Sequence, residues 1–296
     1  MKILLFGCFL MFSVLGLYGQ SFKTINDLSY FGTDEADEKH KLDLYLPEGI
    51  EQPPLLIWIH GGAWAFGNRK NEKALATKFA GEGIAVAVIS YRLSPGAWAD
   101  PKLDKGIQHP EHIIDVARAF GWLHKNAETY GFSQQDIFVS GYSAGGHLSA
   151  LLATDLHYLK DQGLNKEVIK GLIPIAGAYD ISAYHDTHYR YNGPEMAEKH
   201  VKAVFGHSEE DFLSASPTNF VNNLSVPMLL ISENQSYDYT LLFEEAIKKA
   251  GKRNVDYLHV RELDHSGLYQ QLAGSETSKY RDQIVNFILK WSTKRP

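Results

Sequence analysis

The chain has 296 residues, of which 44% are hydrophobic, 22% charged and 12% aromatic, with 25 glycines and 11 prolines. This composition excludes a disordered or fibrous protein, and the length suits one large α/β domain. The formal net charge is −6 and no run of five basic residues occurs, so nucleic acid is excluded as a partner. A small, neutral or weakly polar substrate is compatible with this charge.

The first residues have the layout of a secretory signal peptide. Lys2 precedes an apolar run over 3–18, and we predict cleavage after Gly19, which leaves a single domain at 20–296 in a secreted or periplasmic location. The run is shorter than the ~20 residues that a bilayer requires, so we expect no membrane span in the mature chain. Cys8, the only cysteine, lies in this segment, which excludes disulfides and a cysteine nucleophile. A lipoprotein anchor at Cys8 and an uncleaved anchor helix are the alternatives.

Apolar segments of two kinds alternate along the rest of the chain, with no internal repeat or linker. Short runs rich in Ile and Val predict strands that are buried on both faces of a sheet, and segments with apolar residues at helical spacing predict crossover helices. We therefore expect an α/β fold with a mostly parallel sheet covered on both faces. The expected strands are an antiparallel one at 42–46 and others at 55–59, 84–89, 137–139, 172–175, 228–231 and 255–260, and the expected helices are 71–81, 111–130, 144–159, 241–250 and 276–291.

A G-x-S-x-G motif, residues 141–145, follows the predicted strand at 137–139 and precedes a helix. A serine at such a sharp turn is forced into strained backbone geometry, which exposes its hydroxyl, and the flanking glycines avoid collisions with neighbouring elements. Ser143 is therefore the candidate nucleophile. The N-terminus of the following helix supplies free N–H groups for an oxyanion, with Ala144 as one donor. Tyr142 is a candidate substrate-binding residue.

The sequence His60-Gly-Gly-Ala-Trp64 directly follows the strand at 55–59. Glycines allow backbone N–H groups to approach a developing negative oxygen, so Gly62 and Ala63 are the candidates for the second part of an oxyanion hole. We expect His60 to brace this loop by hydrogen bonding. Trp64 is either a wall of the substrate site or an ordinary packing residue.

The sequence Asp264-His-Ser-Gly267 follows the last predicted strand. An imidazole on a loop at this edge of the sheet can reach the serine proton, so His265 is the candidate general base. Asp264 is adjacent in sequence and its side chain should diverge from that of His265. We therefore expect Asp264 to cap the loop.

The chain resembles the hormone-sensitive-lipase-like branch of the α/β-hydrolases in four motifs, namely HGGAW, GYSAGG followed by HLSALLATD, GAYD after the next strand, and the late DHSG. The similarity extends over about 42–291 and is greatest to small secreted carboxylesterases and feruloyl-esterase-like enzymes, with kynurenine formamidases as near relatives. The resemblance implies the α/β-hydrolase fold. It also implies a nucleophile, a base and an oxyanion hole at Ser143, at His265 and at the N–H groups of Gly62, Ala63 and Ala144.

The triad acid departs from the pattern of this family. The resemblance places the acid near Gln235 or Ser236, and neither is acidic. We expect Asp238 to take this role through a loop of altered length, with Glu233 and Asp180 as alternatives, although Asp238 is also placed to cap the helix that follows. If no acid reaches the imidazole, turnover should be weak, because replacing the triad Asp of a serine protease costs about 10⁴ in rate.

Two segments, 93–109 and 184–200, interrupt the alternation of strands and helices and are predicted to form a small cap over the site. Their aromatic residues either stack on a substrate or fill a small core of the cap. The pairs His185 with His188 and His109 with His112 have spacings that permit a shared metal ion, but no carboxylate completes a ligand set. We therefore predict no metal and no cofactor.

These features together predict a serine hydrolase that cleaves a carboxylic ester through an acyl-enzyme. The resemblance, together with the expected export, implies a small-molecule or oligosaccharide substrate such as an acetyl or feruloyl ester of plant polysaccharide fragments. An arylformamidase-type amide hydrolase with the same residues is the first alternative. The second is a binding protein of this fold with weak or no turnover, which the irregular acid loop favours.

Overall fold

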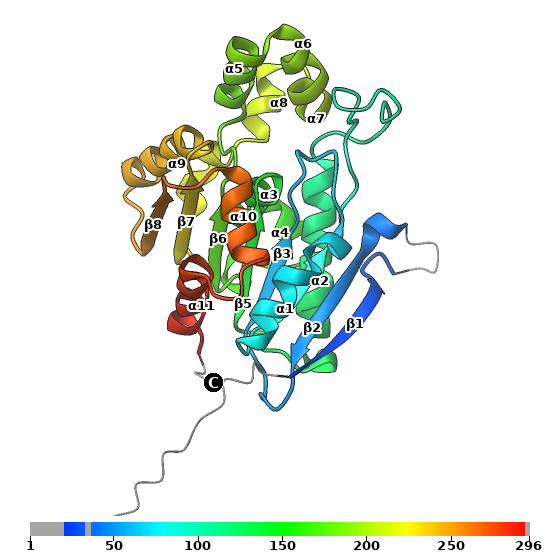
Figure 1. The fold of residues 1–296 in the computed structure, drawn as a ribbon, viewed down its shortest axis with the longest axis vertical. Coiled ribbons are helices and arrows are strands. Elements are labelled where there is room, and N and C mark those ends of the chain that lie inside the picture. Colours follow the sequence, from blue (N-terminus) through cyan, green and yellow to red (C-terminus); the bar gives the residue numbers. More distant parts are fainter. Residues whose placement is uncertain (1–20, 33–36, 294–296) are drawn as a thin grey trace, which may run out of the picture.

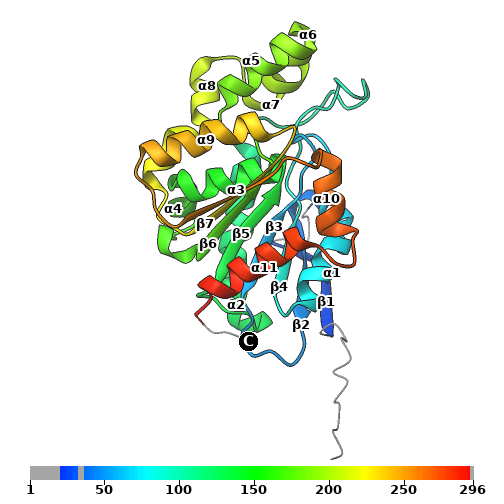
Figure 2. The same cartoon turned by 60° about the vertical axis from the view of Figure 1, so that its left-hand side comes forward.

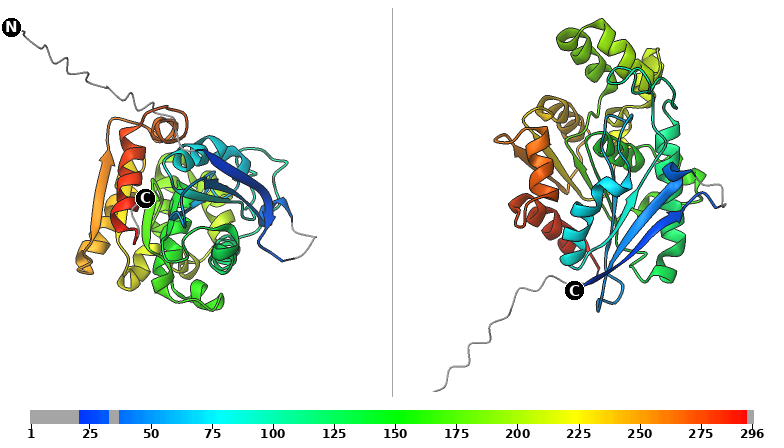
Figure 3. Two further views of the ribbon diagram at one scale, coloured as in Figure 1. Left: turned by 90° about the horizontal axis from the view of Figure 1, so that it is seen from below. Right: turned by 45° about the vertical axis from the view of Figure 1, so that its right-hand side comes forward.

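In the computed structural model, which describes residues 21–32 and 37–293, an eight-stranded sheet runs through the molecule (Figure 1). The strand order is β1-β2-β4-β3-β5-β6-β7-β8, and β2 pairs antiparallel with β1 and β4, whereas all other pairs are parallel. Strands β1 and β8 form the opposite edges of the sheet (Figure 3). The strands are β1 (Phe22–Ser29), β2 (Lys41–Pro47), β3 (Leu55–Ile59), β4 (Ala85–Ile89), β5 (Ile137–Tyr142), β6 (Gly171–Ile175), β7 (Met228–Glu233) and β8 (Val255–Val260).

The predicted α/β fold is thereby confirmed, with β2 as the expected antiparallel strand. Residues 1–19, on which the predicted signal peptide and Cys8 fall, lie outside the described part of the chain. Among residues 21–32 and 37–293, none of the helices combines the length and the apolar character that crossing a membrane requires.

Helices cover both faces of the sheet (Figure 2). Every residue of β3 is buried, and its side chains divide between two hydrophobic clusters because successive residues of a strand point to opposite faces. Helices α2, α3 and α9 pack on the face of Leu55, Ile57 and Ile59, and helices α1, α10 and α11 pack on the face of Leu56 and Trp58. The bounds are α1 (Lys73–Gly81), α2 (Glu111–Tyr130), α3 (Ala144–Thr154), α9 (Tyr237–Lys249), α10 (His265–Ala273) and α11 (Lys279–Trp291).

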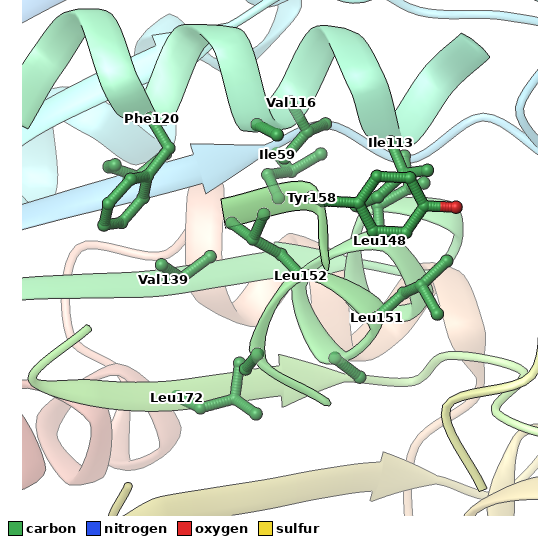
Figure 4. Packing of buried hydrophobic residues seen from close by; sticks show 14 of the residues in the cluster. Ile59, Ile113, Val116, Phe120, Val139, Leu148, Leu151, Leu152, Tyr158 and Leu172 are labelled. Carbon is green, nitrogen blue, oxygen red and sulfur yellow. The ribbon is translucent and has the colours of Figure 1, made fainter. Parts of the chain in front are cut away.

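The packing around α3 holds the helix that follows the G-x-S-x-G motif. Leu148, Leu151 and Leu152 of α3 lie between α2 and the strands β3, β5 and β6, and all three are at most 1% exposed (Figure 4). Each fully buried Leu contributes about 1.5–3 kcal/mol from the removal of its apolar surface from water. This packing therefore fixes the position of α3 against the sheet and α2.

Two helical segments differ from the sequence-based expectation. The predicted helix at 144–159 is split into α3 and the short α4 (His157–Asp161), because Asp155 adopts an extended backbone with φ −92° and ψ 92°. Its carboxylate instead lies 2.6 Å from Nδ1 of His157, a local side-chain contact that competes with helical geometry. Helix α10 is not predicted from the sequence, which indicates a loop around His265 and a next helix only at 276–291, whereas α10 begins at His265 itself.

A cap formed between β6 and β7 lies beyond the carboxyl edge of the sheet (Figure 1). It consists of α5 (Ile181–Asn192), α6 (Pro194–Met196), a π-helical turn (Ala197–Lys202), α7 (Ala203–Phe205) and α8 (Glu209–Ser214). The predicted cap segment at 184–200 falls within it. The segment at 93–109 borders the cap, since the His109 N–H donates to the Val204 carbonyl at 2.7 Å.

Candidate active site

Ser143 occupies the tight turn between β5 and α3 with φ 56° and ψ −117°. A positive φ is costly for a residue with a side chain, so the surrounding structure must hold this conformation. The Ser143 N–H donates to the Ile175 carbonyl at 2.8 Å, and the Ser143 carbonyl accepts from the His147 N–H at 3.0 Å. The turn therefore presents the Ser143 side chain at the carboxyl edge of the sheet.

The glycines around Ser143 are required by close packing. A Cβ on Gly145 would lie 2.0 Å from the Ile59 carbonyl oxygen, and one on Gly141 would lie 2.4 Å from backbone atoms of Gly145. Real side chains do not approach backbone atoms so closely. The glycines thus let α3 start directly against β3, as the motif predicts.

The loop after β3 lies beside Ser143. Gly62 has φ +106°, and a Cβ there would lie 2.4 Å from the Phe66 carbonyl oxygen. Its carbonyl accepts from the N–H groups of Ala65 and Phe66 at 3.0 and 2.8 Å, which closes a tight turn. Gly62 and Ala63 line one cavity together with Ser143, and Ala144 is the first residue of α3, so its N–H has no acceptor inside the helix. These are the three positions expected to supply an oxyanion hole.

The carboxylate that meets His265 is Glu233, the last residue of β7. Oε1 of Glu233 lies 3.0 Å from Nδ1 of His265. The Glu233 side chain is fully buried, whereas that of His265 is 37% exposed. If Nδ1–H donates to this carboxylate, Nε2 of the ring is left free to accept a proton.

The expectation that Asp238 meets His265 is wrong. Asp238 is an exposed residue in the first turn of α9, and the N-cap of that helix is Ser236. Asp180, the third candidate, caps α5 by accepting the Ala183 N–H at 3.0 Å. Glu233 takes the place expected for Asp238 because β7 continues for two residues after its apolar stretch. The end of the strand therefore brings Glu233, and not the start of α9, to the edge of the sheet.

The Glu233 carboxylate is held by backbone donors. The Gln235 N–H donates to Oε2 at 2.5 Å and the Ser236 N–H donates to Oε1 at 2.9 Å. Burial is the largest influence on the pKa of Glu233 and raises it, but the hydrogen bonds from His265, Gln235 and Ser236 together hold the pKa below its ordinary value. The carboxylate therefore stays ionised beside the imidazole.

Two further side chains fix the backbone of His265. The hydroxyl of Tyr142 donates to its carbonyl at 2.5 Å, and Oε1 of Gln235 accepts its N–H at 3.0 Å. Asp264 caps α10 by accepting the Gly267 N–H at 2.6 Å, as expected for a capping residue. The sequence reasoning missed the role of Gln235, which no motif signals. It expected Tyr142 only as a substrate-binding residue, whereas Tyr142 both lines a cavity and positions His265.

Two cavities meet at Ser143 and His265. The smaller, of about 320 Å³, lies on the cap side, and the larger, of about 710 Å³, lies on the side of α10 and of the turn before α1. An ester carbonyl at Ser143 can thus place its two substituents in separate cavities. The smaller cavity is lined by residues that include Trp64, Tyr184, His188 and Tyr239, and the larger by residues that include Glu72, Trp98, Tyr142 and Tyr269.

Trp64 and His60 support the loop after β3. Trp64 is 3% exposed, donates from Nε1 to Nδ1 of His147 at 3.2 Å, and still lines the smaller cavity, so it is both a wall and a packing residue. His60 is fully buried, with Nδ1 2.7 Å from the Gly61 carbonyl and its ring stacked on that of Tyr91. Burial lowers the pKa of His60 to about 4, so the ring is neutral and braces the loop.

The histidine pairs considered as metal ligands have other surroundings. Nε2 of His112 lies 2.8 Å from the Ser94 hydroxyl, and the His188 ring packs edge-on against that of Tyr184. Within the described ranges, no group of three or more His, Cys, Asp or Glu side chains is arranged to hold a metal ion.

The site combines a strained serine between a strand and a helix, a histidine after the last strand and a buried acid at the end of the strand before it. On a mostly parallel sheet, these features define an α/β-hydrolase. Within this class the chain belongs to the BD-FAE family, whose family model matches residues 42–239.

Individual proteins show the same relationship. The chain is 27% identical over 252 residues to the probable carboxylic ester hydrolase LipM of Mycobacterium tuberculosis, a match that covers 81% of this chain but 55% of LipM. It is 27% identical over 261 residues to the kynurenine formamidase of Danio rerio, with 84% of this chain and 77% of that protein covered. The crystal structure of esterase B from Lactobacillus rhamnosis has a TM-score of 0.74 at 19% identity, over 92% of this chain and 86% of that one, and shows the shared fold. The chain thus spans about half the length of LipM.

Proposed function

We propose that the protein is a serine hydrolase of carboxylic esters. One observation carries this proposal: Ser143 and His265 line the same two cavities, while the buried Glu233 meets Nδ1 of His265 at 3.0 Å. A hydroxyl, an imidazole and a carboxylate in this order are the groups that acyl transfer requires. The similarity to LipM, named as a carboxylic ester hydrolase, supports the same reaction.

In the proposed reaction, the Ser143 oxygen attacks the ester carbonyl while Nε2 of His265 takes the hydroxyl proton. The negative charge of the tetrahedral intermediate falls beside the N–H groups of Gly62, Ala63 and Ala144. Glu233 stabilises the imidazolium, which then gives its proton to the departing alcohol and leaves an acyl group on Ser143. His265 then takes a proton from a water molecule that attacks the acyl carbon, the bond to the Ser143 oxygen breaks, and this oxygen receives the proton back as the carboxylic acid product leaves.

We infer that the substrates are acetyl or feruloyl esters of plant polysaccharide fragments and that the protein acts outside the cytoplasm. Three features support this inference: the resemblance to feruloyl-esterase-like enzymes, the signal-like residues before Gly19, and the aromatic walls of both cavities. Aromatic rings bury the apolar part of a ligand, and the polar groups between them fix its orientation.

Hydrolysis of an arylformamide is a second candidate, which the similarity to a kynurenine formamidase favours. The same three side chains can cleave a formamide, so the fold does not discriminate between the two reactions. An inactive binding protein is less well supported than the sequence suggested, because the irregular acid loop was its main argument and Glu233 occupies the position facing His265.

The proposal is tested with purified wild type and Ser143→Ala on 4-nitrophenyl acetate and on an N-formylarylamine. The wild type should cleave the acetate at least about 10³-fold faster than Ser143→Ala, since the variant lacks the nucleophile. Equal, background-level rates for both proteins on both compounds would overturn the hydrolase proposal. A preference for the formamide would favour the second candidate.

A further inference from the structure

A second buried carboxylate lies in the larger cavity. Glu72, at the end of the 3₁₀ turn before α1, is 6% exposed and lines the same cavity as Ser143 and His265. It stands at the N-cap position of α1, but its side chain makes no capping hydrogen bond. Its burial is therefore not explained by the start of the helix.

The contacts of Glu72 occupy only one of its two oxygens. Nε1 of Trp58 donates to Oε2 at 2.9 Å, and the Tyr269 hydroxyl donates to the same Oε2 at 2.7 Å. Within residues 21–32 and 37–293, Oε1 has no hydrogen-bond partner and no cationic side chain pairs with Glu72. Since the residue lines the larger cavity, Oε1 is the oxygen that remains available to a ligand.

Trp58 and Tyr269 each require only a hydrogen-bond acceptor, and this acceptor does not need to be a carboxylate. An amide oxygen would accept from Trp58 and Tyr269 equally well and would avoid the cost of a buried acid without a cation. The pKa of Glu72 reflects this cost: burial raises it above the ordinary value, although the hydrogen bonds from Tyr269 and Trp58 lower it. A buried carboxylate with one unpaired oxygen, in the cavity that the candidate nucleophile lines, indicates recognition of a donor.

The position of Glu72 sets which part of a substrate it can reach. Its partner Tyr269 lies four residues after His265 on α10, about one turn or ~6 Å along the axis, so Glu72 meets α10 about one turn from the base. The larger cavity, at about 710 Å³, has room for the bulkier part of an ester, and the smaller one, at about 320 Å³, for a short acyl group.

We propose that Oε1 of Glu72 accepts a hydrogen bond from a donor on the alcohol part of the ester, several bonds away from the ester oxygen. This inference rests on the proposed esterase function and specifies its substrate class, namely esters whose alcohol carries a hydroxyl or an ammonium group. Both groups share the required N–H or O–H donor. The aromatic rings of Trp98, Tyr142 and Tyr269 in the same cavity bury the carbon skeleton between the ester and the donor.

The test compares three series of acetates with increasing chain length: n-alkyl, ω-hydroxyalkyl and ω-dimethylaminoalkyl acetates, the last protonated at pH 7. At the fitting length, wild-type kcat/KM should be about tenfold higher for at least one of the donor esters than for the n-alkyl ester, the effect of one hydrogen bond to a charged group. Whether the hydroxyl, the ammonium or both are preferred identifies the source of the donor.

Glu72→Gln should abolish this preference, so that the variant cleaves donor and n-alkyl esters of equal length with kcat/KM values within about twofold of each other. Because Trp58 can only donate, the glutamine oxygen stays on its side and the NH₂ group faces the cavity, so the ammonium ester should lose most. Glu82→Gln, which changes an exposed carboxylate at the other end of α1, is the matched control and should keep the preference.

Each result decides between the proposals. Equal wild-type rates on donor and n-alkyl esters at every length would overturn the subsite alone, and this comparison holds even if Glu72→Gln does not fold. A preference that appears instead with methyl ω-hydroxyalkanoates, and disappears in Glu72→Gln, would overturn the assignment to the alcohol side. If the wild type cleaves no ester faster than Ser143→Ala, the esterase proposal fails and the subsite fails with it.

Discussion

Glu233 reaches Nδ1 of His265 from the last position of β7, and not from the loop that follows. A residue that ends a buried strand has its backbone fixed by the pairing on that strand, here to Val260 of β8. The carboxylate is therefore more rigidly placed than a loop residue would be. Such rigidity suits a hydrogen-bond acceptor that must hold one imidazole tautomer throughout a reaction.

Replacing this acid should impair catalysis much more than replacing the exposed acid nearby. We expect Glu233→Gln to lower kcat by about 10³–10⁴, since the amide does not stabilise the imidazolium or its tautomer. Asp238→Asn should stay within about twofold of the wild type, because Asp238 is exposed on α9. Steady-state kinetics on 4-nitrophenyl acetate measures both, and a variant pair with the opposite ranking would refute the role of Glu233.

The sequence predicted seven of the eight strands, the helix at 111–130 and the serine turn, because each follows from a hydrophobic period or from steric requirements. It did not predict β1, which has no buried residue and therefore no clear hydrophobic pattern. The acid was assigned to the wrong residue because its place depends on where β7 ends. The apolar run stops at Ile231, but Ser232 and Glu233 continue the ladder opposite His259 and Val260. Backbone pairing with a neighbouring strand leaves no mark in the hydrophobic pattern of one strand, so a single sequence could not place this boundary.

The side chains that hold His265 were also beyond prediction, for a different reason. Gln235 and Tyr142 each make one side-chain hydrogen bond to the backbone of His265. Gln235 lies thirty positions before His265 in the sequence, and Tyr142 lies more than a hundred positions before it. Their effect depends on tertiary distances and not on residue type. His265, by contrast, was identified because its position after the last strand follows from topology alone.

Gln235→Ala should lower kcat without a comparable change in KM. The variant keeps the backbone N–H that donates to Glu233 but loses the oxygen that accepts from His265, so the base is held less tightly. We expect a loss of about tenfold in kcat, the scale of one hydrogen bond that positions a catalytic group. Asn234→Ala, an exposed neighbour, is the control and should remain near wild-type kcat. A rise in KM at constant kcat would indicate that Gln235 contacts substrate instead.

Stability should fall as the pH is lowered from about 6.5 to about 4. Burial lowers the pKa of His60 and His147 to about 4 and that of His200 to about 3, all below the value of about 6.5 in an unfolded chain. In this window the unfolded state binds protons that the folded state does not, so stability present above pH 6.5 is lost on acidification. Each such histidine contributes up to about 1.4 kcal/mol per pH unit.

Urea unfolding at several pH values between 7.5 and 4.5 tests this dependence. His147→Asn should unfold more easily at neutral pH but show a slope smaller by the contribution of one proton, because Asn does not titrate. The slopes are compared rather than the absolute free energies, since the variant also alters packing at Trp64. An unchanged slope in His147→Asn would exclude His147 as a source of the acid sensitivity.

Gly145→Ala should damage the fold at the serine turn, in contrast to Gly81→Ala at the end of α1. The added Cβ at residue 145 would lie 2.0 Å from the Ile59 carbonyl, which forces α3 away from β3, whereas a Cβ at residue 81 meets no atom within 4 Å. We expect Gly145→Ala to lose about 1–3 kcal/mol or more of unfolding free energy, and Gly81→Ala to be neutral or more stable by up to about 1 kcal/mol. Thermal unfolding of both variants at equal concentration measures the difference.

Because the shift of α3 also moves Ser143, activity on 4-nitrophenyl acetate should fall in Gly145→Ala below what its folded fraction explains. Wild-type stability and rate in that variant would show that α3 does not need to approach β3 so closely.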